Sequence, residues 1–95
     1  MSRIQATATQ VIDDAKVRVT RFDFAPGAET GWHEHGFDYV ITTLSDCHMQ
    51  LEEPNGEVRE VFVAAGTSYR RENGIKHNVI NGGTAVMSFV EVELK

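Results

Sequence analysis

Three histidines are the residues of this chain whose type and spacing could do chemistry. His33 and His35 are separated by one residue, and His77 lies far downstream. Side chains at positions i and i+2 project from the same face of a β-strand but from nearly opposite faces of a helix. The pair can therefore converge on one ion only from an extended backbone. Imidazole binds zinc, copper, iron and nickel, so the pattern indicates a metal site carried by strands.

Two motifs surround the histidines. The first contains, in order, Gly27, His33, His35, Tyr39 and Asp46, and the second contains Gly66, Glu72, Gly74, His77 and Asn81. Their spacing resembles the paired signature of the cupin superfamily, whose first motif is Gly, His-x-His, Glu, Gly and whose second is Gly, Pro-x-Gly, His, Asn. The resemblance covers roughly Val17 to Val90, most of the chain. It implies one cupin domain over residues 1–95, an all-β fold built as a small antiparallel, jelly-roll-like barrel.

In the resembled family the metal lies near the barrel mouth, held by the three histidines and the motif-one Glu. Here Tyr39 stands at the position of that Glu, which removes a candidate ligand and a negative charge. Three interpretations remain: Tyr39 points inward as a weak ligand or as a hydrogen-bond donor to substrate, Asp38 swings in through a bulge, or His33, His35 and His77 bind the metal with water. We favour the third. Adjacent strand residues face opposite ways, so Asp38 points outward if Tyr39 takes the inward position. In the resembled family, cupins with three histidines also exist, including thiol dioxygenase relatives.

The predicted cofactor is a divalent transition metal (Fe, Ni, Zn or Mn), and imidazole does not select among these ions. Three neutral histidines leave the metal its full charge, so we expect its ligand to be a small acid. In Tyr69-Arg70-Arg71, strand alternation turns one Arg inward, where a guanidinium could bind a carboxylate. The alternative, which we prefer, is that both arginines lie along the rim. Tyr39 and Arg71 are the candidate substrate-binding residues, and no catalytic residue is assigned.

Two classes of function fit these residues. The first is a metal-dependent enzyme acting on a small organic acid or amino-acid-derived substrate, with dioxygenase-type chemistry among the options, and the second is a non-catalytic cupin that binds a small ligand. The segments Ala25 to Gly36 and His77 to Asn81 also resemble small bacterial single-domain cupins, some of them labelled β-alanine degradation proteins. That resemblance favours a small-acid substrate and leaves the reaction open.

Composition and charge limit the kinds of partner that this chain is expected to bind. The net charge of −5 and the lack of a basic stripe argue against nucleic acid. No apolar run of about 18 residues occurs and the first residues lack a secretory core, so we expect no membrane and a cytoplasmic protein. The chain buries only a modest surface, and we expect a C2 homodimer formed through exposed strand edges at Thr7–Ile12 and Thr84–Leu94.

Short strands separated by turns must position the histidines. Apolar alternation predicts strands at Lys16–Phe24, Phe37–Leu44, Cys47–Glu52, Glu57–Val63, Thr67–Arg71, His77–Asn81 and Thr84–Leu94. Within the first of these strands the pattern changes phase, which predicts a bulge near Thr20 or Arg21. Cys47 is expected to pack with Met49 and Leu51, while His48 and Trp32 are expected to face away from the site.

Overall fold

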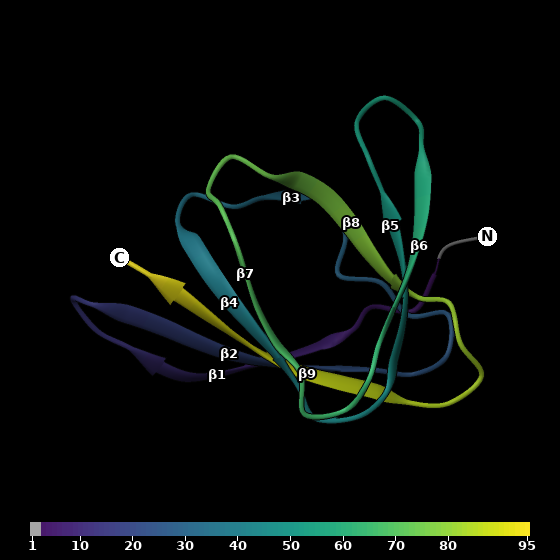
Figure 1. The fold of residues 1–95 in the computed structure, drawn as a ribbon, viewed down its shortest axis with the longest axis horizontal. Coiled ribbons are helices and arrows are strands. Elements are labelled where there is room, and N and C mark those ends of the chain that lie inside the picture. Colours follow the sequence, from purple (N-terminus) through teal and green to yellow (C-terminus); the bar gives the residue numbers. More distant parts are fainter. Residues whose placement is uncertain (1–2) are drawn as a thin grey trace.

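The fold is entirely β. The computed structural model describes residues 3–95, which contain nine strands and no helix (Figure 1). The strands are β1 (Thr7–Asp13), β2 (Val17–Phe24), β3 (His33–Glu34), β4 (Asp38–Thr43), β5 (Cys47–Glu52), β6 (Val58–Val63), β7 (Ser68–Arg71), β8 (Lys76–Asn81) and β9 (Met87–Leu94). The predicted all-β class is confirmed, and none of the described residues forms a helix that could cross a membrane.

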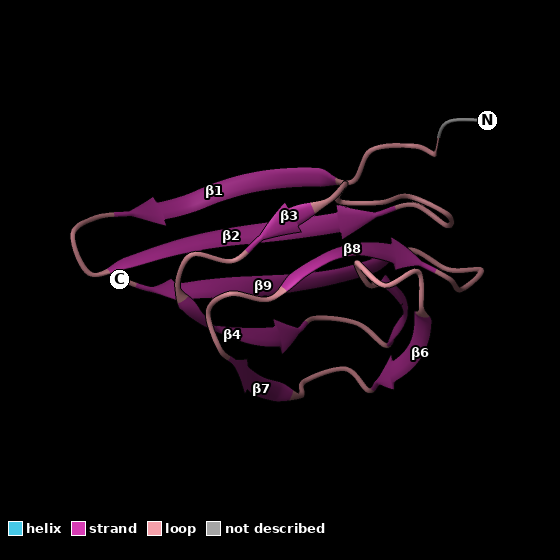
Figure 2. Cartoon of the chain, turned by 90° about the horizontal axis from the view of Figure 1, so that it is seen from above, coloured by secondary structure: helices cyan, strands magenta, loops and turns pink. Residues whose placement is uncertain are grey.

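Two antiparallel sheets face each other. One has five strands in the order β1-β2-β9-β4-β7, and the other has four in the order β3-β8-β5-β6. Figure 2 shows β3 and β8 lying over the larger sheet, so that the histidine-bearing strands form one wall of the interior. The expected barrel is thus a jelly roll of two sheets that do not form one closed hydrogen-bond ladder over residues 3–95.

The core lies between the sheets and follows the alternation of β4 and β5. Tyr39 and Ile41 point inward from β4, while Cys47, Met49 and Leu51 point inward from β5, and all five are buried. The predicted packing of Cys47 with the two apolar residues of its strand is therefore correct. The rings of three phenylalanines complete this layer, with centroid separations of 5.4 to 6.3 Å, namely Phe22, Phe24 and Phe89.

Strand β2 corrects one prediction. It pairs with β9 in unbroken register from Val17 opposite Leu94 to Phe24 opposite Met87, so there is no bulge near Thr20 or Arg21. The irregularity lies instead in the neighbouring β1, between Gln10 and Ile12. The apparent change of phase arose because apolar residues occupy both faces of β2.

Strand β9 corrects a second prediction. It lies between β2 and β4, so Thr84–Leu94 is not an exposed edge, whereas β1 is an edge as expected. Its valines at positions 90 and 92 share the outer face of the sheet with Leu94. Its inner face carries Met87 and Phe89, followed by two buried acids, Glu91 and Glu93.

Candidate metal centre

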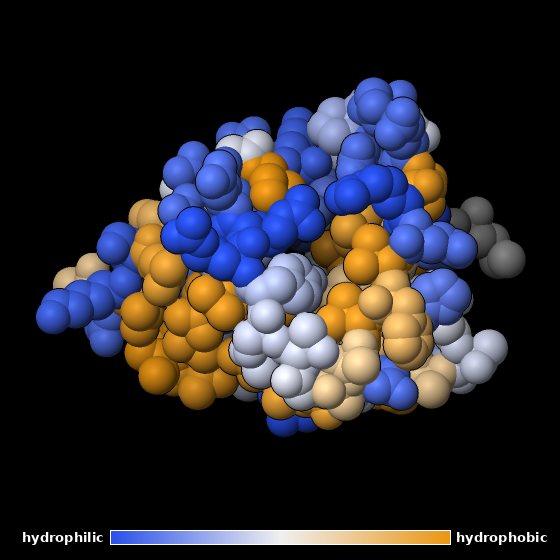
Figure 3. All heavy atoms as spheres, viewed as in Figure 1, coloured by the Kyte–Doolittle hydropathy of each residue, from blue (hydrophilic) through white to orange (hydrophobic). Residues whose placement is uncertain are grey.

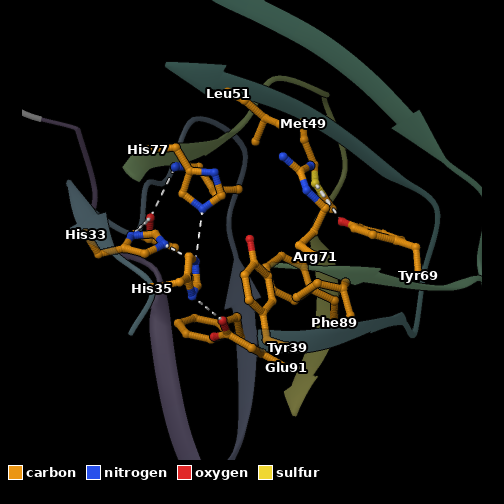
Figure 4. A pocket seen from close by; sticks show the side chains of 14 residues that line it. His33, His35, Tyr39, Met49, Leu51, Tyr69, Arg71, His77, Phe89 and Glu91 are labelled. Atoms are coloured by element: carbon orange, nitrogen blue, oxygen red, sulfur yellow. Dashed lines mark hydrogen bonds and ion pairs between the residues drawn. The ribbon is translucent and has the colours of Figure 1, made fainter. Parts of the chain in front are cut away.

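The two sheet strands β3 and β8 bring the three predicted ligands together. They pair antiparallel with His33 opposite His77, and the extended chain continues to His35. The Nε2 atom of His35 lies 3.0 Å from that of His33 and 3.2 Å from that of His77. His35 and His77 are buried, and His33 is half-buried. Figure 4 shows the three rings turned toward one point beside a pocket.

The outer nitrogens of two rings show where their protons lie. His33 Nδ1 is 2.9 Å from the carbonyl oxygen of Gly31, which can only accept, so Nδ1 carries the proton. His35 Nδ1 is 3.1 Å from Oε1 of Glu91, which favours the same form. Both Nε2 atoms then direct lone pairs at each other across 3.0 Å. A cation between them relieves that repulsion, and the donor set therefore fits a divalent transition metal.

Burial keeps the imidazoles of His33 and His77 in the neutral form, which is the form that binds metal. Desolvation, together with the neighbouring His33 and His35, lowers the pKa of His77 to about 3. Desolvation also lowers the pKa of His33, although its contact with the Gly31 carbonyl works in the opposite direction. Protons therefore compete weakly with a metal for these two nitrogens near neutral pH.

A buried amide fixes the loop that precedes His33. Asn78, next to His77 on β8, accepts a hydrogen bond of 3.0 Å from the backbone N–H of Gly31. Its Nδ2 donates to Glu29 and Glu52, each at 2.7 Å. Gly31 has a φ of 85°, a left-handed conformation that favours glycine, and its carbonyl faces His33. The sequence analysis did not identify Asn78. Its position next to His77 was the available sign that it could belong to the site.

Tyr39 occupies the motif position of the missing Glu and points inward. Its ring stacks on His35, with centroids 3.8 Å apart and planes at 19°, and its side chain is 2% exposed. The hydroxyl faces the cavity in Figure 4 and makes no hydrogen bond with another described residue. Burial raises the pKa of Tyr39 to about 12. Asp38 points away and accepts hydrogen bonds of 2.9 and 3.1 Å from Asn73, so it does not take the place of the Glu.

The cavity beside the histidines is small and mostly apolar. Its volume is about 30 Å³, room for roughly two water molecules. Its walls include Phe22, Thr30, Ile41, Met49, Leu51, Tyr69, Val79 and Phe89, together with the three histidines, Tyr39, Arg71 and Glu91. A ligand in this space contacts the histidine nitrogens on one side and the phenol of Tyr39 on another.

Arg71 turns inward from β7 and lines this cavity, while Arg70 is exposed on the opposite face. The preferred expectation that both arginines lie along the rim is therefore wrong. No hydrogen bond or ion pair joins the Arg71 guanidinium to another residue within 3–95, although Figure 4 shows it close to Met49 and Tyr69. A half-buried cation without a counter-ion creates a place for an anionic group.

Two acids on the inner face of β9 were missed by sequence reasoning. Glu93 accepts two hydrogen bonds from Arg18, at 2.7 and 2.8 Å. Glu91 approaches His35, but its Oε1 makes no well-aligned hydrogen bond with a described residue. In the sequence these two acids alternate with Val90, Val92 and Leu94, a pattern that usually places the apolar side chains in the core. His48 and Trp32 lie outside the site, as predicted.

Similarity to individual known proteins identifies the family of this chain, although no family model matches it. The β-alanine degradation protein BauB of Pseudomonas aeruginosa is 48% identical over 93 residues, covering 98% of this chain and 97% of the relative. A cupin domain from Bordetella pertussis superposes with a TM-score of 0.94 at 42% identity, covering 100% of this chain and 98% of that one. The polyketide cyclase RemF of Streptomyces resistomycificus shares the fold, with a TM-score of 0.73, 23% identity and coverage of 99% and 70%. On this sequence identity and this structural match, the chain belongs to the cupin superfamily.

Proposed function

We propose that this protein is a metal-binding cupin in which His33, His35 and His77 hold one divalent transition metal ion. The observation that carries the proposal is the convergence of three Nε2 atoms, two of them on rings whose Nδ1 faces an acceptor. The bound metal would supply positive charge and open coordination positions at the cavity. Iron, nickel, zinc and manganese all accept such a donor set, so identity is a matter for measurement.

The proposed ligand is a small organic acid or an amino-acid-derived acid. Arg71 offers a guanidinium that has no partner among the described residues, and Tyr39 offers a phenol that stays protonated at neutral pH because its pKa is about 12. A carboxylate can accept from both groups. The cavity of about 30 Å³ restricts the ligand to a few heavy atoms unless side chains move. The relative BauB is named for the degradation of β-alanine, which is a small amino acid.

Catalysis on that acid, including dioxygenase-type chemistry, is the first form of the proposal, and binding without catalysis is the second. Among the described residues that line the cavity, burial raises the pKa of both tyrosines, so both phenols stay protonated at neutral pH and are suited to donate to a bound acid, which either form of the proposal requires. Glu91 approaches the outer nitrogen of His35, on the side of the ring away from the three Nε2 atoms.

The test begins with metal content and affinity after the metal-free protein is loaded separately with iron(II), nickel, zinc and manganese. Calorimetry then measures the binding of two- to four-carbon carboxylates and amino acids by the loaded protein. Arg71→Met should weaken carboxylate binding about 10-fold or more, because a hydrogen bond to a charged group contributes about 1.5–3 kcal/mol. Arg70→Met is the matched control, since its side chain lies on the other face. Equal losses in the two variants would count against the small-acid ligand.

Oxygen consumption by the iron-loaded protein separates the two forms of the proposal. The same panel of acids, extended to small thiols, is added one compound at a time. Consumption that depends on a compound that also binds supports an enzyme. Binding without consumption, and without any change in the compound by mass spectrometry, supports a ligand-binding cupin.

We also propose a C2 homodimer that buries the outer face of the five-stranded sheet. Four aliphatic residues lie in register across β1, β2, β9 and β4, and they are Ile12, Val19, Val92 and Val40. Figure 3 shows hydrophobic surface gathered at the lower left, over β2 and the end of β9. A face of this kind can pack against its own copy across a twofold axis. Light scattering should return twice the 10.6 kDa of one chain, and Val92→Asp should return a monomer. A wild-type mass near 10.6 kDa at micromolar concentration would reject the dimer.

A further inference from the structure

Glu91 is a buried carboxylate whose surroundings do not account for it. It points from β9 into the interior and is 6% exposed. Its Oε1 lies 3.1 Å from His35 Nδ1 but out of line for a hydrogen bond, and this oxygen has no other partner among the described residues. Buried carboxylates are costly unless they are paired. The position therefore points to an interaction that is completed when the histidine cluster is filled.

The neighbouring charges leave His35 as the partner of Glu91. Arg18 of β2 lines a pocket together with Glu91, but its Nε and Nη2 both donate to Glu93. Arg71 lines the same cavity and makes no ion pair with Glu91 in the described part of the chain. The group that approaches within 4 Å is the imidazole of His35, through the nitrogen opposite its Nε2.

Glu91 is not placed as a metal ligand. The group of side chains whose donor atoms lie within 4.8 Å of one another consists of His33, His35 and His77. Because Glu91 faces Nδ1, the ring of His35 stands between its carboxylate and the point where the three Nε2 atoms meet (Figure 4). Carboxylates that accept from the outer nitrogen of a ligating histidine fix its tautomer and make its other nitrogen a better donor.

We propose that Glu91 replaces, through His35, the negative charge that the first motif loses at Tyr39, and this inference rests on the proposed metal site. Glu91 accepts the Nδ1 proton of His35 and directs the Nε2 lone pair at the metal. The negative charge of Glu91 then acts on the metal through the ring of His35, and the carboxylate itself takes up no coordination position. In this role Glu91 is a positioning residue, and the face of the metal toward Tyr39 and Arg71 stays open to an anion.

Metal affinity provides the first test. Zinc dissociation constants are measured by chelator competition for the wild type, Glu91→Ala and Glu91→Gln. We expect Glu91→Ala to bind zinc 10- to 100-fold more weakly, the usual effect of losing such a partner. Glu91→Gln should fall between the wild type and Glu91→Ala, because its amide oxygen accepts a proton but carries no charge.

The matched control is Glu93→Gln, which changes the same side-chain type two residues along the same face of β9 but touches Arg18. Its zinc affinity should stay within twofold of the wild type. The inference is overturned if Glu91→Ala also binds within twofold. It is overturned as well if Glu91→Ala loses zinc as completely as His35→Ala, because Glu91 would then be a ligand.

The second test reads the tautomer of His35 in the metal-free protein by ¹⁵N NMR of the imidazole nitrogens. The wild type and Glu93→Gln should hold the proton on Nδ1, whereas Glu91→Ala should show a mixture of the two tautomers. A wild-type proton on Nε2 would overturn the inference whatever the zinc affinities are. Absence of metal binding by the wild type overturns the proposed function and this inference together. Metal binding that ignores Glu91 overturns this inference alone.

Discussion

Replacing Tyr39 by Phe removes one hydroxyl and should leave the metal in place while weakening the binding of the acid. The phenyl ring retains the stack on His35, where the centroids are 3.8 Å apart, so packing around the histidines is preserved. The hydroxyl makes no hydrogen bond with another described residue, so no protein contact is lost. Loss of the hydroxyl should therefore lower the affinity of the cavity for its ligand.

The magnitude follows from the acidity of the phenol. With its pKa raised by burial to about 12, Tyr39 is ionised in about one molecule in 10⁵ at pH 7. Removing that proton at pH 7 costs about 7 kcal/mol, which tyrosinate ligation would have to offset. A protonated phenol that donates to a carboxylate contributes about 1.5–3 kcal/mol, so the acid should bind about 10- to 150-fold more weakly to Tyr39→Phe.

The assay pairs metal analysis with calorimetry on the same samples. Metal content of Tyr39→Phe should match the wild type, and only the affinity for the acid should fall. Tyr69→Phe removes the other phenol of the cavity, whose oxygen lies 4.0 Å from Met49 Sδ, and it controls for the general effect of losing a hydroxyl there. A large drop in metal content in Tyr39→Phe, absent in Tyr69→Phe, would refute the reasoning and establish tyrosinate as a ligand.

Three further results are expected. His77→Ala should lose near-stoichiometric metal because two nitrogens remain, whereas His48→Ala, which lies outside the site, should keep it; equal metal content in both would contradict the site. In the metal-free protein the pKa of His77 is about 3 against an ordinary 6.5, so the unfolded state binds more protons and stability falls as pH drops below 6.5. Urea unfolding should show this as a loss of about 2 kcal/mol at pH 5, and His77→Asn should show less of it. Tyr39→Glu should bind metal more tightly and the acid more weakly; tighter binding of both would be inconsistent with the proposed role of charge.

The histidine cluster was predictable from a local rule together with a family resemblance. The i, i+2 spacing of His33 and His35 requires an extended chain, and the resemblance of the second motif to the cupin signature assigned His77 to the same site. Alternation likewise placed Cys47 and Met49 inside β5, since strand period fixes facing once one residue is assigned. Spacing alone did not give the separations of 3.0 and 3.2 Å, which depend on the pairing of β3 with β8.

The facing of β9 was not predictable from hydrophobic pattern. A central strand with valine at 90 and 92 alternating with Glu91 and Glu93 is ordinarily read with its valines inward. Here the acids are inside because Arg18 pairs with one and His35 approaches the other. Both partners lie more than 50 positions away in sequence, so no local window contains them. The inward turn of Arg71 depends in the same way on the pairing of β7 with β4.

The change from Glu to Tyr at position 39 and the inward facing of Glu91 have one electrostatic consequence. A carboxylate at position 39 would lie on the cavity side of the metal, where it would repel an incoming acid by about 4 kcal/mol at 4 Å in a medium of effective dielectric 20. The phenol of Tyr39 removes this repulsion and supplies a donor in its place. Glu91 carries its charge behind His35, while Arg71 offers the opposite charge within the cavity. In the proposed metal-bound protein, the field across the site would therefore favour an anion between the metal and Arg71. The substitution that removes a possible metal ligand at position 39 would then also be the one that admits an acid.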